Sequence, residues 1–327
     1  MNLYATLYRQ LEEKLASLYD SPSFKPENLF APQRYILSLG GKRLRPLLAL
    51  IVADMMNGDI SKAMPSALCV ELFHNFSLIH DDILDKAPLR RGKKTVHKKW
   101  NTNIAILSGD AMLVRAYQEL QQSDKLILPE LLKVFNTTAI EVCVGQQEDM
   151  DFESMDQVSV EMYKKMITGK TAVLLACSMQ MGALCAGVAE KDAKSLYECG
   201  KHLGIAFQLK DDLLDVFGDS ELFGKQVGGD IISNKKTFLL LMAMEKAKNK
   251  DLKLLHKLLG DKRIKPLKKV ALVKSIYESL HIREITETEI QHHFDKAIRS
   301  LNAIKKINAA KKKVFVSFCR DLMGREK

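Results

Sequence analysis

The chain has 327 residues, of which 46% are hydrophobic, and its formal net charge is +10. This length suits either two ordinary domains or one large domain with a substantial core. The charge is uneven, because residues 242–327 hold 22 Lys and Arg against 10 Asp and Glu, while the rest is close to neutral. The basic segments are typical of polar faces of amphipathic helices, with few aromatics and no zinc-finger spacing. The composition therefore argues against nucleic-acid binding.

The cysteines and the N-terminal sequence indicate a cytoplasmic location. None of the six cysteines forms a CxxC pair, and most lie inside apolar stretches, as expected of small core residues in a reducing compartment. The N-terminus carries charges where a secretory signal needs an apolar run, so we interpret it as a helix. Residues 171–189 have no charged side chain and approach a membrane span in length. Ser178, Gln180 and two glycines dilute that stretch, which favours a fully buried helix over a stable membrane span.

Apolar residues recur at three- and four-residue spacing in nearly every segment, and strand-like alternation is almost absent. The sequence therefore predicts an all-α fold. No long linker of low complexity and no repeat period emerges, so residues 1–327 are predicted to form one large domain. In chain order, the helices are expected to break at residues 19–29, 40–46 and 57–59, at Pro88, at Gly169, and at residues 218–229 and 260–266.

The segment "HDDILDKAPLRRGKKTVH", residues 80–97, places three carboxylates just before a basic run. Asp81, Asp82 and Asp85 could form a solvated, charged helix face with no chemical role. Alternatively, they could hold divalent cations that bridge to an anionic ligand, with Arg90 and Arg91 binding the rest of that ligand. This segment alone does not distinguish the two interpretations.

A second segment, "FQLKDDLLDVFGD", repeats the pattern with Asp211, Asp212 and Asp215. In a helix, positions i and i+4 share one face, so each DDxxD offers two stacked carboxylates and a third at the flank. Oxygen ligands of this kind suit Mg²⁺, which usually keeps waters and substrate phosphates in its shell. Both copies follow apolar runs. The repetition favours a metal site over two solvated faces.

Basic side chains accompany both acidic clusters. Lysine acts as a compact point charge for phosphate, and arginine as a planar fork for bidentate contact. A site with six carboxylates and about seven basic groups would bind a strongly anionic ligand, and two pyrophosphates fit that description. The basic candidates are Lys42, Arg45, Arg90, Arg91, Lys170, Lys225 and Lys235.

The order of these motifs resembles that of the trans-isoprenyl diphosphate synthases, also called polyprenyl synthetases. The resemblance runs from Gly40 to about Thr237, through "GGKRLRP", "HNFSLIHDDILD", "RRG", "SGDAM", "GQQED", "GKT", "FQLKDDLLD", "GK" and "GGD". It implies an isoprenoid synthase fold, a bundle of long helices around a central cavity with both acidic clusters at its mouth. It also implies a homodimer that condenses isopentenyl diphosphate with an allylic diphosphate (dimethylallyl, geranyl or farnesyl).

The resemblance also implies a role for each matching residue. The six aspartates would bind about three Mg²⁺ around the allylic diphosphate, with help from Arg90, Lys170, Lys225 and Lys235. The positions that hold isopentenyl diphosphate without metal match Lys42, Arg45, His74 and Arg91. Thr171 and Gln208 match residues near the carbocation, and Gln146 and Asp149 match a polar pair beside the first metal site. Lys170, Thr171, Gln208, Asp211 and the first cluster would thus form the catalytic set.

Several of these residues have simpler interpretations. His74 lies on an apolar helix and could be a satisfied core histidine. Gln208 could be an ordinary buried hydrogen-bonding residue, and Lys236 could face solvent. The family commonly has glycine where this chain has Asn234 and proline where it has Leu239, which weakens the assignment of Lys235.

The residues before the first cluster indicate the product length. The product should grow along the helix that carries Asp81, so Ser77, Phe76 and Phe73 would form the floor of its cavity. Bulky phenylalanine would block a long chain. A single aromatic residue five positions before Asp81, with Ser77 beside it, resembles geranylgeranyl synthases more than the double-aromatic farnesyl type, so we expect geranylgeranyl diphosphate ahead of farnesyl diphosphate. The alternatives are a long-chain polyprenyl synthase for quinone side chains, a class I terpene cyclase, or a catalytically inert partner subunit.

Overall fold

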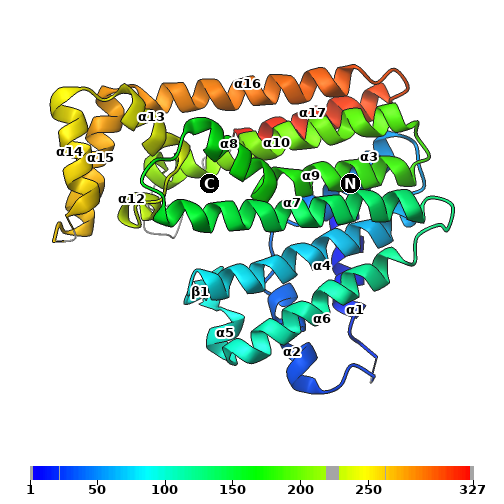
Figure 1. The fold of residues 1–327 in the computed structure, drawn as a ribbon. Helices are drawn as coiled ribbons and strands as arrows, with labels where there is room; N and C mark the ends of the chain where they lie inside the picture. Colours follow the sequence, from blue (N-terminus) through cyan, green and yellow to red (C-terminus); the bar gives the residue numbers. More distant parts are fainter. Residues whose placement is uncertain (1–2, 22, 219–227, 262, 325–327) are drawn as a thin grey trace. The chain divides into compact units, whose positions relative to one another are not determined.

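The structure is a computed structural model that describes residues 3–21, 23–218, 228–261 and 263–324 (Figure 1). Nearly all regular elements in these ranges are helices, which confirms the all-α prediction. The chain divides into two compact units. Unit 1 comprises Met1–Asn136, Cys177–Lys194 and Lys306–Lys312, and unit 2 comprises Thr137–Ala176, Ser195–Lys305 and Lys313–Lys327. Four helices contribute residues to both units: α7 (Leu128–Ser154), α9 (Val173–Cys185), α10 (Glu190–Phe217) and α17 (Ala309–Met323).

Unit 1 is built around α4 (Ile60–Leu84), which packs against α6 (Thr102–Leu120) and α3 (Leu44–Met55) (Figure 1). The middle of α4 is buried on all sides, because its run from Ser66 to Phe73 contains one charged residue, Glu71. Two N-terminal helices, α1 (Leu3–Ser17) and α2 (Glu27–Ser38), complete the packing, with α1 against α3 and α2 against α6. The aspartates of the first cluster thus lie at the C-terminal end of a helix that the core holds in place.

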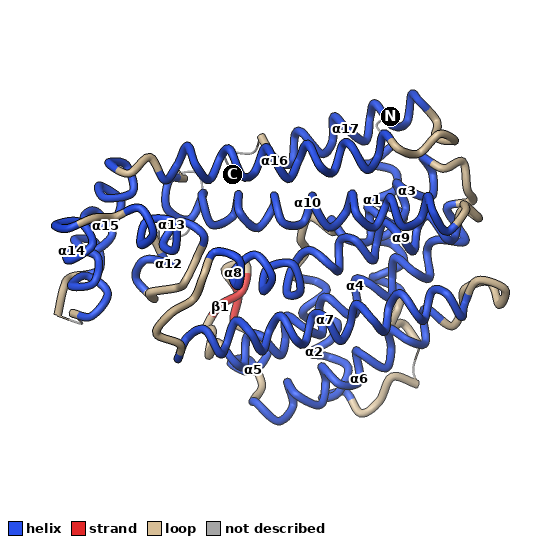
Figure 2. The backbone as a smooth tube through the Cα atoms, turned by 45° about the horizontal axis from the view of Figure 1, so that its top comes forward, coloured by secondary structure: helices blue, strands red, loops and turns tan. Residues whose placement is uncertain are grey.

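A short hairpin follows α4 and precedes α5 (Val96–Lys99). Strands β1 (Leu89–Arg90) and β2 (Lys93–Lys94) pair antiparallel, and they are drawn in red in Figure 2. The turn residues Arg91 and Gly92 have φ of 50° and 73°, as a two-residue hairpin of type I′ requires. The sequence predicted a break at Pro88 but not these strands, because two-residue strands are too short to show alternation.

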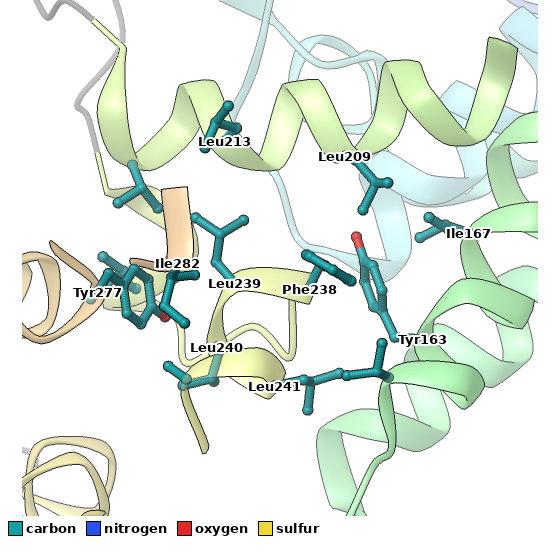
Figure 3. Close-up of a cluster of buried hydrophobic side chains, with 14 of the residues drawn as sticks. Tyr163, Ile167, Leu209, Leu213, Phe238, Leu239, Leu240, Leu241, Tyr277 and Ile282 are labelled. Carbon is teal, nitrogen blue, oxygen red and sulfur yellow. The ribbon is translucent and has the colours of Figure 1, made fainter. Parts of the chain in front are cut away.

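Unit 2 has its own apolar core (Figure 3). Tyr163 lies among Ile167, Leu209 and Phe238, with its oxygen toward α10. The core joins α8 (Val160–Ile167), α10, α13 (Phe238–Lys246), α14 (Asn249–Gly260), α15 (Pro266–Ser279) and α16 (Ile282–Asn302), and the short α12 (Gly229–Ile232) packs on α15. These helices fix the base from which the second acidic cluster projects.

The predicted helix break at Gly169 is wrong. A π-helical turn, η1 (Thr168–Ala172), runs directly from α8 into α9 without interruption. Gly169 serves a close helix contact instead, because a Cβ there would lie 2.9 Å from the Glu141 carbonyl oxygen. Opposite it, a Cβ on Gly145 would lie 2.2 Å from the Lys170 nitrogen. The two glycines therefore let α7 approach the turn that carries Lys170.

The uncharged stretch at residues 171–189 largely forms α9, and most of its residues are buried, as expected of a core helix. No helix among the described residues is long and apolar enough to cross a membrane. The helix is apolar on all sides because the protein interior surrounds it.

Candidate active site

The first acidic cluster occupies the C-terminal end of α4. Asp81 and Asp82 lie in its last turn, and Asp85 is its C-cap residue. Asp82 is buried and accepts two hydrogen bonds from Arg90, from Nε and Nη2, each of 2.8 Å. The hairpin brings Arg90 back to α4, so the two residues form a bidentate ion pair. The structure therefore places the predicted metal ligand Asp82 and the predicted phosphate ligand Arg90 in direct contact.

His74 lies in a strongly positive environment. Its Nε2 is 3.3 Å from Nη1 of Arg45. Burial lowers the pKa of His74 well below its ordinary value, and the charges of Arg45, Arg91, Arg90 and Arg43 lower it further. The imidazole is therefore neutral, and its Nε2 accepts from Arg45, which can only donate. His74 thus has a hydrogen-bond partner, as a satisfied core histidine would, and its surroundings are also those expected of a diphosphate site, because four guanidinium groups lower its pKa.

Arg91 packs against the glycine turn that precedes α3. Its Nη1 donates to the carbonyl oxygen of Gly40. Gly41 has a φ of 135°, and a Cβ there would lie 2.7 Å from Nη2 of Arg91. Only glycine accommodates both this backbone conformation and this contact. Lys42 follows directly and is exposed, so the turn brings two of the predicted diphosphate ligands together.

Arg43, to which the sequence assigned no role, is the centre of a buried network in unit 1. Its Nε donates to Glu12 and its Nη1 to Glu71, both at 2.7 Å, and its Nη2 donates to the Leu37 carbonyl oxygen at 2.6 Å. Asn75 donates to the same Glu71 oxygen at 2.9 Å. The Arg43 side chain is only 1% exposed. Burial lowers its pKa, but the two glutamates more than offset this and raise it overall.

The second acidic cluster lies near the end of α10 in unit 2. Asp211 is exposed, Asp212 is buried and Asp215 is half-buried. Asp212 accepts hydrogen bonds from the Tyr163 hydroxyl and, at 3.0 Å, from Nε2 of Gln208. Burial raises the pKa of Asp212 to about 6, although both hydrogen bonds and Lys235 lower it. The site thus holds a carboxylate that is costly to ionise in the absence of a further cation.

Asp230 extends this acidic group. Its backbone N–H donates to Oδ2 of Asp215 at 3.0 Å. Burial raises the pKa of Asp230 to about 6, Lys235 lowers it, and Asp215 and Asp212 raise it again. Asp230 is the last residue of the "GGD" motif, and the sequence alone assigned it no role. The contact of Tyr163 with Asp212 was missed altogether, because no local sequence pattern marks it.

Lys170 and Thr171 project from the π-helical turn η1. Lys170 Nζ lies 2.6 Å from Oδ2 of Asp149, and Thr171 donates to Oε1 of Gln208 at 3.0 Å. Gln208 thereby links Thr171 to Asp212 through its two amide ends.

Gln146, beside this group on α7, has a buried side-chain oxygen without a hydrogen-bond partner among the described residues. Lys225, the other predicted lysine of this set, lies outside the described residues.

The chain departs from the family pattern at two positions near Lys235, namely Asn234 and Leu239. Asn234 has a φ of 58°, a left-handed conformation that asparagine adopts more readily than most residues, which explains why it can replace glycine. Its side chain accepts from Lys269 and donates to the Leu259 carbonyl oxygen at 3.0 Å. Leu239 is fully buried within α13. The backbone N–H of Lys235 donates to the carbonyl oxygen of Asp230 at 2.9 Å, so a backbone hydrogen bond connects Lys235 to Asp230.

The interpretation of Lys236 as solvent-facing is wrong. It is half-buried, and its Nζ donates to the carbonyl oxygens of Phe152 and Met155 at the end of α7. Carbonyl groups at a helix C-terminus lack intrahelical partners, so a lysine there stabilises that end.

The predicted cavity floor is part of a larger aromatic cluster in unit 1. Phe76 is half-buried, and its ring centroid lies 5.6 Å from that of Phe73. Phe73 packs edge-to-face on Phe135 at 5.3 Å, and Phe135 on Tyr117 at 5.1 Å. Ser77 turns its hydroxyl back to the His74 carbonyl oxygen at 2.9 Å. Beneath Phe76, the apolar packing therefore continues through three more rings.

The acidic residues provide the kind of donors that Mg²⁺ binds. Within the described ranges, no three His, Cys, Asp or Glu side chains converge into a closed metal site. Mg²⁺ is usually bound through one or two carboxylates plus waters and substrate phosphates, so such a site needs no closed set of protein ligands. The buried Asp212 and the half-buried Asp230, whose pKa values are raised, would be stabilised in their charged form by a divalent cation. These donors fit the metal that the sequence predicts.

An all-α fold with two DDxxD helices and a basic glycine turn is typical of enzymes that act on prenyl diphosphates. The family model described as polyprenyl synthetase matches residues 26–280. A geranylgeranyl diphosphate synthase from Methanosarcina mazei is 38% identical over 71% of this chain and 72% of its own length. The crystal structure of a geranylgeranyl pyrophosphate synthase aligns with a TM-score of 0.94 and 45% identity over 100% of both chains.

A second crystal structure, a geranylgeranyl pyrophosphate synthetase from Pyrococcus horikoshii, aligns with a TM-score of 0.91. It is 30% identical and covers 98% of this chain and 97% of its own. The chain therefore belongs to the polyprenyl synthetase family and is a trans-prenyltransferase.

Proposed function

We propose that the protein is a Mg²⁺-dependent short-chain synthase that condenses isopentenyl diphosphate with an allylic diphosphate and makes mainly geranylgeranyl diphosphate. The presence of both complete DDxxD clusters together with the basic "GGKRLRP" turn carries this proposal. A class I terpene cyclase has no use for that turn, and an inert subunit would be expected to lose part of one cluster. The similarity to the proteins named geranylgeranyl diphosphate synthase supports the product.

In unit 1, the positive group around His74 would bind isopentenyl diphosphate without metal. Lys42, Arg45 and Arg91 would contact its phosphates, and neutral His74 would orient Arg45 through their 3.3 Å contact. Because His74 is uncharged, it adds no further positive charge to the surrounding guanidinium groups. The guanidinium groups are instead balanced by the incoming diphosphate.

The acidic clusters would act on the allylic diphosphate. Asp81, Asp82, Asp85, Asp211, Asp212 and Asp215 would hold about three Mg²⁺, and when bound these ions supply charge that stabilises the departing pyrophosphate. Lys170, Lys225 and Lys235 would add positive charge, with Arg90 shared between Asp82 and the phosphates. Thr171 and Gln208 would present polar oxygens toward the allylic cation after the C–O bond breaks.

Carbon–carbon bond formation then needs few protein groups. The double bond of isopentenyl diphosphate attacks the allylic cation, and the departing pyrophosphate removes the proton that restores an alkene. No side chain near Thr171 and Gln208 has to serve as a base. The apolar surroundings of the prenyl chain exclude water from the cation.

The aromatic cluster supports a short product. Phe76 would end the cavity, and Phe73, Phe135 and Tyr117 would resist its extension. A long-chain polyprenyl synthase would need this region to be open, so that alternative predicts small residues where this chain has packed aromatic rings.

We also propose that residues 1–327 act as a single domain, that the protein is a cytoplasmic homodimer, and that a second copy of the chain covers its exposed apolar residues. Four helices contribute to both units, which supports one domain. In unit 1, α6 exposes Leu107 and Val114, seven residues apart, and in unit 2, α7 exposes Ile140 and Val144. Sedimentation equilibrium should give twice the 36.9 kDa chain mass.

An incubation of the pure protein with Mg²⁺, labelled isopentenyl diphosphate and, separately, dimethylallyl, geranyl or farnesyl diphosphate tests the proposal. After dephosphorylation, chain-length analysis should give mainly a twenty-carbon alcohol. Products longer than thirty carbons would contradict the proposed floor but not the chemistry. No product with any starter would contradict the proposed function.

A further inference from the structure

Helix α1 lies outside the segment that matches the family model, yet it contacts the substrate-binding turn directly. The match begins at residue 26, and α1 ends at Ser17. Within unit 1, the Tyr8 hydroxyl donates to the Gly41 carbonyl oxygen at 3.1 Å. One helical turn further on, Glu12 accepts from Nε of Arg43 at 2.7 Å. The two side chains lie at i and i+4 and therefore face the same way.

The backbone of the contacted turn is unusual. Gly40 and Gly41 have φ of 73° and 135°, and Arg43 has a φ of 45°. A residue with a Cβ rarely adopts such a conformation unless its surroundings hold it there. Arg43 is held on three sides, by Glu12, by Glu71 and by the Leu37 carbonyl oxygen.

The turn also carries the proposed ligands of isopentenyl diphosphate. Lys42 lies between Gly41 and Arg43, the two residues that α1 contacts. The neighbouring carbonyl oxygen, that of Gly40, accepts from Arg91. Any shift of this backbone would therefore move Lys42 and the acceptor of Arg91 together.

We propose that Glu12 and Tyr8 of α1 are positioning residues for the isopentenyl diphosphate site, and that α1 thereby sets the affinity for this substrate alone. This inference rests on the proposed function. Neither side chain needs to touch the substrate: Glu12 fixes Arg43, and Tyr8 fixes the carbonyl group of Gly41. Without them the turn would sample other conformations, and part of the binding energy would be lost in ordering it.

Steady-state kinetics of the full chain with Glu12→Gln and Tyr8→Phe test this proposal. The KM for isopentenyl diphosphate should rise about tenfold in Glu12→Gln and a few-fold in Tyr8→Phe. The KM for the allylic diphosphate should stay close to that of the wild type in both variants, and so should the melting temperature of Tyr8→Phe. The matched control is Glu13→Gln, because Glu13 lies on the same helix in an exposed ion pair with Arg9. It should leave both KM values unchanged.

Equal changes in the two KM values, or none, would overturn the proposal. If Glu12→Gln unfolds, Tyr8→Phe decides the matter, since it removes a single hydroxyl group from a half-buried residue. A wild-type protein without transferase activity would instead refute the proposed function. An active wild type with unaltered variants would refute only the role of α1.

Discussion

The two units handle buried charge in opposite ways. In unit 1, the buried Arg43 donates hydrogen bonds to the carboxylates of Glu12 and Glu71, which raise its pKa. In unit 2, Asp212 is buried and Asp230 half-buried, and desolvation raises the pKa of both to about 6 although Lys235 lowers it. For Arg43, the protein itself supplies the opposite charge. The two aspartates gain from an added cation.

This difference matches the two substrates that we propose. The hydrogen bonds of Arg43 would hold the turn that carries Lys42, so that this lysine can bind a diphosphate directly. A group of desolvated carboxylates cannot bind a diphosphate without a cation between them. On this proposal, the group around Arg43 supports the metal-free substrate site, and Asp212 and Asp230 belong to the metal-dependent one.

The largest effect is expected from removing a carboxylate that the proposed metal needs. Asp211→Asn should lower kcat/KM by at least about 100-fold, because a metal ion that binds more weakly would stabilise the departing pyrophosphate less. Asp211 is exposed, so the fold should survive the substitution. Glu190→Gln, at an exposed position of the same helix, is the control. Assays at saturating Mg²⁺ that showed equal activity in both variants would remove Asp211 from the metal site.

Breaking the buried network around Arg43 should cost stability. Arg43→Met leaves Glu12 and Glu71 without their cation, and the free energy of unfolding should fall by about 3–5 kcal/mol. Arg9→Met, in an exposed ion pair on α1, should change it by less than about 1 kcal/mol. Urea denaturation measures both. A loss of similar size in the two variants would show that the buried network does not stabilise unit 1.

In unit 2, removal of the half-buried charge of Asp230 should change the free energy of unfolding in the opposite direction. A carboxyl group whose pKa is raised by folding binds its proton more tightly in the folded state, so its contribution to stability falls as pH rises from about 4 to 6. Asp230→Asn should therefore raise the free energy of unfolding of the metal-free protein by about 1–3 kcal/mol at pH 8. The gain should vanish near pH 4.

The control for Asp230→Asn is Asp156→Asn, which changes an exposed acid of unit 2 and should have little effect at either pH. Urea denaturation in EDTA at pH 4 and pH 8 compares the three proteins. If Asp230→Asn destabilised the protein at pH 8, the ionised Asp230 carboxylate would be stabilising in the metal-free protein, which would contradict this prediction.

The smallest effect concerns the proposed apolar floor in unit 1, which carries no charge. Phe76→Ala should lengthen the product by about one isoprene unit, because Phe73, Phe135 and Tyr117 still close the space behind it. Leu84→Ala, at an exposed position of the same helix, is the control. Chromatography of the dephosphorylated products that showed an unchanged length distribution would remove Phe76 from the floor.

The sequence predicted the features that depend on short spacing. Helical periodicity predicted the all-α fold, and the position of Asp81, Asp82 and Asp85 at the end of a long apolar helix followed from the run before them. Breaks near residues 40–46 and 57–59 were also correct, since glycine, asparagine and proline interrupt helices through their own backbone preferences.

Features that depend on long-range contacts were not predictable. Arg43 meets Glu12 and Glu71 from 31 and 28 residues away, and no local pattern joins them. Gly169 was read as a helix break because the sequence does not show that another helix approaches it closely. The raised pKa values of Asp212 and Asp230 depend on burial, which tertiary packing alone determines.

Calorimetric titration with and without Mg²⁺ tests the central contrast between the two units most directly. Isopentenyl diphosphate and a non-hydrolysable allylic diphosphate analogue would each be titrated into the protein in EDTA and again in Mg²⁺. We expect the Kd for isopentenyl diphosphate to change by less than about threefold, and the analogue to bind at least about 100-fold more tightly with Mg²⁺. An analogue that bound equally well in EDTA, or isopentenyl diphosphate that required Mg²⁺, would contradict this account.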